Sequence, residues 1–173
     1  MDALQIISFD SLGKLVSVVL ALAGAWWAYE KWRKRDEHFP RVYFEVSVNF
    51  LGLKEDQILC ELVATLENKG VVPLKIRKFS FLLRGLGNQD LIERGGDEIR
   101  NQIVFPNRLE QGMFVPKDWD FTFVYPGVRT EYNFVTAIPR NTEFVRMQGD
   151  FEYLRTGSSH HAAKILKVPD FEG

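Results

Sequence analysis

The hydrophobic period of this chain changes once, near Arg41, and that change sets the classes of fold it can adopt. Between about residues 10 and 29, apolar residues recur with the helical period of about 3.6. After Arg41, apolar and polar residues alternate, which is the period of a strand with one buried face. The first apolar positions of this alternation are Val42, Phe44, Val46, Val48 and Phe50. The sequence therefore predicts one N-terminal helix followed by a β-domain.

The β-part predicts seven to nine short strands separated by turns. Ile58, Cys60, Leu62, Ala64 and Leu66 continue the alternation after a turn near Gly52, and a phase slip near Arg77 and Lys78 indicates a bulge. Further strands are expected at residues 102–105, 110–115, 119–125, 131–138, 143–154 and 161–168. Residues 85–100 are Gly-rich and charged and predict a long loop, and residues 156–159 predict a hairpin turn.

This strand spacing is typical of a sandwich or a barrel. Residues 66–74 contain Asn68-Lys69-Gly70 followed by Pro73, with a positive φ expected at Gly70. A strand that ends in such a turn and resumes after a proline resembles immunoglobulin-like bacterial β-domains. The predicted fold class is therefore mainly β, with an N-terminal transmembrane helix over residues 1–40 and an immunoglobulin-like antiparallel β-sandwich over residues 41–173.

The apolar stretch itself predicts a membrane anchor. Residues 11–30 supply the about 20 residues that a bilayer core of about 30 Å requires. The end of this stretch and the residues after it carry aromatic and then basic side chains, as expected at a membrane interface. These are Trp26, Trp27, Tyr29, Lys31, Trp32, Arg33, Lys34 and Arg35. The predicted localisation is a single pass through a bacterial inner membrane, with the N-terminus outside, residues 36–173 in the cytoplasm, and membrane lipids as partners. A cleaved signal peptide is the alternative, but the leading region is not basic.

One side of the predicted helix carries small or polar residues at the spacing of a helix–helix seam. The predicted oligomerisation or pore residues are Asp10, Gly13, Lys14, Ser17, Ala21, Gly24, Ala25 and Ala28. We expect this stripe to drive homo-oligomerisation, with Asp10 and Lys14 facing a water-filled lumen in a ring of helices. A plain anchor with the same composition is the alternative.

Catalytic signals are sparse. The only candidate catalytic residues are Arg155 and His160, whose Arg-x4-His spacing is that of the ribonuclease motif of HEPN domains. HEPN domains are helical, whereas this motif lies on a predicted hairpin, so a solvated hairpin tip is the alternative. No Ser/His/Asp set, phosphate-binding Gly loop or Cys/His cluster occurs, so we expect no enzyme activity, no cofactor and no metal.

The charge pattern limits the partners. The net charge of −1 gives no overall basic field, so direct nucleic-acid binding is not expected, and the single cysteine, Cys60, excludes an internal disulfide framework. Lys75, Arg77, Lys78 and Arg84 form a local basic patch that suits an acidic partner or a nucleotide, or is a solvated strand face. The acidic residues of 90–98 could meet the basic strand of a neighbouring subunit.

Chain length, the N-terminal apolar helix and the Arg155-x4-His160 motif together resemble the small membrane accessory proteins of type VI-B CRISPR loci. The resemblance implies a pore-like oligomer that perturbs the inner membrane in antiviral defence, in functional rather than direct partnership with an RNA-guided nuclease system. Two alternatives remain. One is a membrane-tethered adaptor whose β-domain recruits a soluble partner, and the other is a ribonuclease that uses Arg155 and His160.

Overall fold

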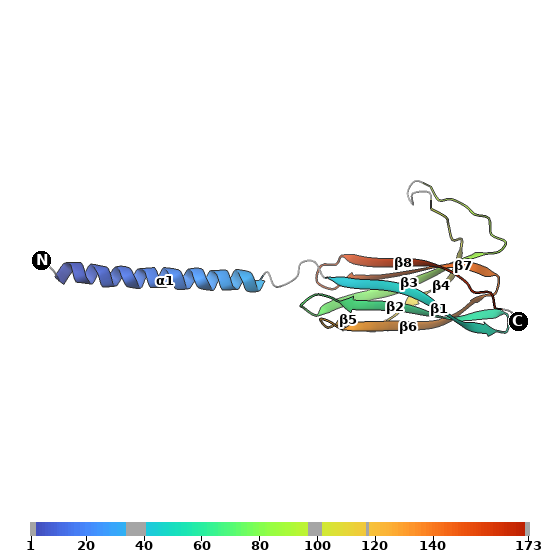
Figure 1. Ribbon diagram of the computed structural model, residues 1–173, viewed down its shortest axis with the longest axis horizontal. Coiled ribbons are helices and arrows are strands. Elements are labelled where there is room, and N and C mark those ends of the chain that lie inside the picture. Colours follow the sequence, from blue (N-terminus) through green and yellow to red (C-terminus); the bar gives the residue numbers. More distant parts are fainter. Residues whose placement is uncertain (1–2, 34–40, 97–101, 117, 172–173) are drawn as a thin grey trace. The chain divides into compact units, whose positions relative to one another are not determined.

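The structure is a computed structural model that describes residues 3–33, 41–96, 102–116 and 118–171, and side chains of the helix from residue 13 to 31. The chain divides into two compact units, Met1–Phe39 and Pro40–Gly173. The first unit contains the helix α1 (Ala3–Arg33), and the second contains eight described strands (Figure 1). The second unit is called the β unit below.

Helix α1 corrects the membrane prediction. Among the described residues, no helix is long and apolar enough to cross a membrane. Charged Lys14 and Glu30 bound its apolar run, and the about 15 residues between them rise about 22 Å, which is short of the about 30 Å of a bilayer core. Ser17, Gly24 and the two tryptophans lower the hydropathy within the run further. This finding contradicts the predicted transmembrane helix. The predicted single-pass inner-membrane localisation and its topology depend on that helix and are therefore wrong as well.

Sheet A of the β unit has three antiparallel strands in the order β1-β2-β6. β1 (Val42–Lys54) pairs with β2 (Gln57–Asn68), and β2 pairs with β6 (Arg129–Pro139). The alternation predicted for the first two strands is confirmed, because Ile58, Cys60, Leu62, Ala64 and Leu66 are all buried. The expected turn near Gly52 is instead a bulge within β1, and the chain turns at Glu55 and Asp56.

Sheet B has the order β4-β3-β7-β8, with the short β5 also paired to β3. Its strands are β3 (Leu74–Gly87), β4 (Asn107–Met113), β5 (Thr122–Val124), β7 (Thr142–Tyr153) and β8 (Ser159–Lys167). The bulge predicted near Arg77 and Lys78 is confirmed by a register shift after Arg77 and by a φ of 50° at Lys78. Strands were also expected over 102–105 and the whole of 119–125. Ile103 instead forms only an isolated bridge to Arg94, and only the β5 part of 119–125 is a strand.

The two sheets share one apolar core, to which both contribute alternate residues. Phe79 of β3 is fully buried and contacts the rings of Phe44 and Tyr132 from sheet A. Gly149 of β7 makes room for this contact, because a Cβ atom there would lie 2.8 Å from Val46 and 3.0 Å from the Phe44 ring. A salt bridge of 2.8 Å between Lys164 of β8 and Glu45 of β1 joins the sheets at one edge.

All described strand pairs of the β unit are antiparallel. The expected immunoglobulin-like sandwich fits this arrangement only in part. Immunoglobulin constant domains place four strands in the first sheet and three in the second. Here sheet A has three strands and sheet B has five. Gly85 and Gly87 belong to β3 rather than to the expected loop, and the described residues 88–96 and 102–106 between β3 and β4 form a projection from the two sheets (Figure 1).

Candidate functional site

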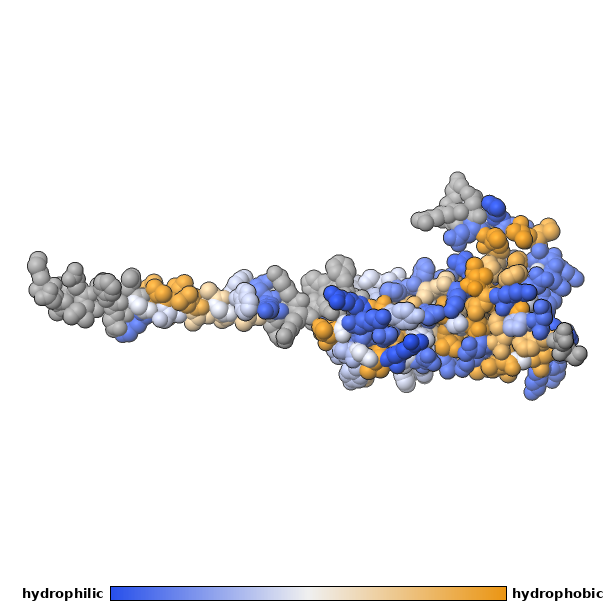
Figure 2. Space-filling view, in the orientation of Figure 1, coloured by the Kyte–Doolittle hydropathy of each residue, from blue (hydrophilic) through white to orange (hydrophobic). Residues whose placement is uncertain are grey.

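Helix α1 presents apolar side chains over its surface (Figure 2). Every described side chain from residue 13 to 31 is exposed except Glu30, which is partly exposed. The large apolar side chains are each 50–67% exposed, and these are Leu15, Val16, Val18, Val19, Leu20, Leu22, Trp26, Trp27 and Tyr29. A surface of this kind gains free energy when another apolar surface covers it.

The predicted oligomerisation stripe lies open on this helix. A Cβ atom added at Gly13 or Gly24 would meet nothing within 4 Å, so another helix has room to approach there. Lys14, Ala21, Ala25 and Ala28 are exposed. The Ser17 hydroxyl donates a hydrogen bond of 2.9 Å to the carbonyl oxygen of Gly13, so it needs no acceptor on a partner. The side chain of Asp10 lies outside the described residues.

The predicted interfacial residues form local contacts along α1. The Trp26 and Tyr29 rings lie 6.4 Å apart, and the Lys31 ammonium lies 4.6 Å from the centre of the Trp27 ring. The side chains of Trp32 and Arg33, and all of Lys34 and Arg35, lie outside the described residues.

Arg155 and His160 lie at the β7–β8 hairpin. Arg155 is exposed in the turn, where Gly157 has a φ of 68°. The His160 ring stacks on Phe151, with centroids 5.5 Å apart, and its Nδ1 lies 2.9 Å from the Tyr153 hydroxyl. Burial, followed by the nearby His161, lowers the pKa of His160. These contacts describe an imidazole built into an aromatic cluster at the edge of the core.

The residues of the predicted basic patch on β3 have different surroundings. Lys75 lies over the Phe121 ring at 5.0 Å. Arg77 and Lys78 both bind Glu152 of β7, at 3.1 and 2.9 Å, so their charge is partly compensated and the pKa of Glu152 is lowered. Arg84 lies further along the strand, away from this pair in the register.

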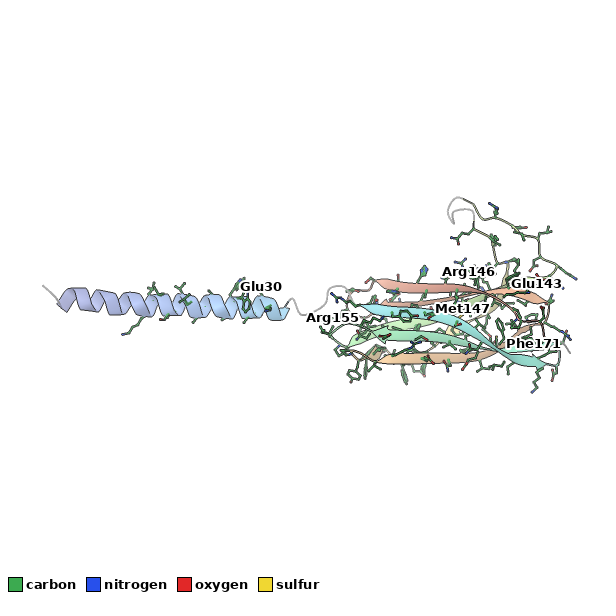
Figure 3. All side chains as sticks on the ribbon, in the orientation of Figure 1. Glu30, Glu143, Arg146, Met147, Arg155 and Phe171 are labelled. Atoms are coloured by element: carbon green, nitrogen blue, oxygen red, sulfur yellow. The ribbon has the colours of Figure 1, made fainter. Side chains whose placement is uncertain are left out.

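Arg84 is the centre of a row of three arginines across sheet B. Its register partners are Arg108 on β4 and Arg146 on β7. Leu83 and Val145, which adjoin Arg84 and Arg146 in the chain, are fully buried, so alternation places these two arginines on the outer face, and Arg108 is exposed. Figure 3 labels Arg146 on β7. We refer to Arg84, Arg108 and Arg146 as the arginine row.

Sequence reasoning missed the arginine row although it singled out Arg84. The three residues are separated by more than 20 positions in the chain, and only strand pairing brings them together. A correct pairing of β3 with β4 and β7 was the signal needed. Of the acidic residues 90–98, Asp90 makes local contacts: its carboxylate accepts hydrogen bonds from the Gly87 amide and the Asn107 side chain. Residues 97–101 lie outside the described residues.

Two other surfaces of the β unit gather polar or aromatic side chains. A polar hollow on sheet A is lined by Glu45, Asn49, Glu61, Arg129 and Glu131 among others. Within the described ranges, no group of three or more His, Cys, Asp or Glu side chains could hold a metal ion. The second surface is a run of exposed aromatic side chains before and along β5, namely Trp119, Phe121, Phe123 and Tyr125.

No protein family and no curated protein matches this sequence. Among solved structures, the chain is similar to the crystal structure of a protein from Bordetella pertussis described as ApaA, at a TM-score of 0.47 and 18% identity, over 75% of this chain and 95% of that chain. It is also similar to the X-ray structure of the structural genomics target SoR45, at a TM-score of 0.44 and 15% identity, over 73% of this chain and 84% of that chain.

Proposed function

We propose that this chain is a non-enzymatic accessory protein that assembles with copies of itself through α1 and uses its β unit to recruit a partner. The main observation in support is that the large apolar side chains of α1 are exposed. The setting that we propose, antiviral defence beside an RNA-guided nuclease system, rests on the family resemblance alone. The membrane pore required a spanning helix and is not part of this proposal.

The arrangement of these side chains favours an assembly larger than a dimer. At about 100° per residue, the large apolar side chains from Val18 around to Leu20 occupy an arc of about 200° on α1. One neighbouring helix covers a stripe of about 100°. Two neighbours are therefore needed to cover the arc, which a bundle of three or more helices provides.

The small-residue stripe supports a second copy as the occupant. Ser17, Ala21 and Gly24 recur at the spacing that brings them onto one face, and Gly24 leaves open space for a neighbouring backbone. A second copy brings large apolar side chains that fit against such a face. It also carries the same small-residue face. Each helix can therefore pack its large apolar side chains on one neighbour and its small face on another.

Sedimentation velocity of the full chain at micromolar concentration tests the proposal. We expect a species of three or more copies for the native chain. The variant Leu15→Gln with Leu22→Gln should sediment as a smaller species, since it removes apolar surface from α1. The matched control is Leu91→Gln with Ile92→Gln, which removes two apolar side chains of the β unit that are even more exposed and should leave the assembly unchanged.

A native chain that sediments as a monomer would contradict the proposal, as would an α1 variant that assembles like the native chain. Recruitment of monomers to phospholipid vesicles would make lipid, rather than a second copy, the occupant of α1. Ala21→Leu with Gly24→Leu adds bulk to the stripe in a residue that favours helices. We expect this variant to lose the native assembly while circular dichroism shows unchanged helix content.

A further inference from the structure

The arginine row places three like charges side by side on neighbouring strands. Adjacent strands lie about 4.8 Å apart, so the row extends about 10 Å across the outer face of sheet B. No described residue forms an ion pair with Arg84, Arg108 or Arg146. Like charges directly opposite one another destabilise a sheet. The row therefore carries a repulsion that no ion pair among the described residues offsets.

The central arginine of the row is held by the backbone, and amide side chains lie in the next row of the face. The Arg84 guanidinium donates a hydrogen bond of 3.1 Å to the carbonyl oxygen of Phe105, which fixes its position at the centre. The next row of the same face contains Gln111, Leu82 and Gln148, which are register partners. Two amide side chains thus lie beside three guanidinium groups, and both kinds of group bind carboxylates and peptide carbonyls; the Gln148 amide donates a hydrogen bond of 3.2 Å to the Asp150 carboxylate.

We propose that the arginine row is a docking site for an acidic polypeptide segment of a partner protein. The inference rests on the proposed recruiting role of the β unit and names the chemistry of the partner. Guanidinium groups form paired hydrogen bonds with carboxylates. An extended segment with acidic residues at alternate positions presents several carboxylates to one face, so it engages the whole row at once.

The shape and charge of the face favour a polypeptide over other anions. The row lies on an outer sheet face, and the two hollows, one on sheet A and one near Arg140 and Phe171, include none of the three arginines. A small anion on such an open face stays largely hydrated and gains little. Nucleic acid requires a basic field that extends along several phosphates, whereas the arginine row extends only about 10 Å and Asp150 and Glu152 follow on β7, so the row suits a few carboxylates.

The binding experiment uses the full chain and a fluorescent peptide of alternating Glu and Ser, measured by anisotropy at low and physiological salt. We expect saturable binding that weakens with salt, and a loss on the order of 5-fold for each of Arg108→Gln and Arg146→Gln. The matched control is Arg129→Gln on sheet A, which should bind like the native chain. A single-stranded RNA of the same net charge is the competing probe.

Thermal stability is a second measurement, and it distinguishes a ligand-binding role of the arginine row from a purely structural one. If the row is kept for a ligand, Arg146→Gln should raise the thermal midpoint at low salt by about 1–3 °C while it weakens peptide binding, because it relieves repulsion. Binding that Arg108→Gln and Arg146→Gln leave unchanged would overturn the proposal. So would RNA that binds more tightly than the peptide, or a destabilised Arg146→Gln.

Failure of docking and failure of assembly are separable. The Leu15→Gln and Leu22→Gln variant disperses the proposed oligomer without altering sheet B, so each of its copies should still bind the peptide. Loss of peptide binding in this variant alone would tie the site to the assembled state and overturn docking to a single β unit. Native peptide binding by a chain that never assembles would retain the docking site and reject only assembly through α1.

Discussion

At the scale of single residues, His160 shows how surroundings decide the role of a side chain. Its sequence spacing from Arg155 suggested acid–base chemistry. In the structure its ring packs between Phe151 and Phe44 and contacts the Tyr153 hydroxyl. Burial disfavours the charged imidazolium, so the pKa of His160 lies below its ordinary value.

This direction fixes the pH dependence of stability. Below the ordinary histidine pKa of about 6.5 the unfolded chain binds a proton that folded His160 resists, so the free energy of unfolding should fall as the pH drops from 7 to 5. Urea unfolding of the native chain and of His160→Phe across this range measures the contribution. The variant keeps an aromatic ring and should lose part of the pH slope.

His161→Gln is the control, because His161 contributes less to the shift than burial does. This variant should keep most of the slope. An unchanged slope in His160→Phe would show that the imidazole is accessible to protons in the folded chain.

At the scale of elements, Asn68 joins three segments of the β unit. Its buried side chain accepts a hydrogen bond from the Gly70 amide and donates to the carbonyl oxygens of Val72 and Val124. The turn after β2 is therefore closed by an asparagine side chain. The positive φ expected at Gly70 is absent, and positive φ values occur at Gly52, Gly127 and Gly157 among the described glycines.

We predict that Asn68→Ala lowers the free energy of unfolding by about 2–4 kcal/mol, because it leaves buried backbone groups without partners. Asn133→Ala on β6 removes an exposed asparagine and should change stability by less than about 0.5 kcal/mol. Chemical denaturation of both variants measures the difference. Equal effects would mean that water replaces the Asn68 bonds.

At the scale of the β unit, Phe79 unites the two sheets. It is fully buried on β3 and contacts Phe114 and Phe151 within sheet B and its loops, as well as Phe44 and Tyr132 of sheet A. Five rings thus meet at one point of the core. Removing the central ring leaves a cavity that side chains from both sheets must fill.

Phe79→Ala should therefore cost about 3–5 kcal/mol of unfolding free energy, a large share of the about 5–15 kcal/mol of a typical domain. Phe123→Ala, which removes an exposed ring on β5, is the matched control and should cost far less. Thermal unfolding followed by near-UV circular dichroism compares them. A Phe79→Ala variant as stable as the control would place the core elsewhere.

The sequence by itself determined the alternating strands, the bulge at Arg77 and Lys78 and the single helix, because each depends on the local period of side chains. Strands 102–105 and 119–125 were over-predicted, since a strand also needs a neighbour to pair with, and few of these residues have one. Only the tertiary structure showed that β4 pairs with β3 in sheet B, that His160 packs among aromatic rings, and that Arg84 is the register partner of Arg108 and Arg146. These features arise from pairing between residues distant in the chain, which a local period does not encode. The membrane prediction for α1 counted residues 11–30 as one apolar stretch, whereas Lys14 and Glu30 bound a shorter apolar run.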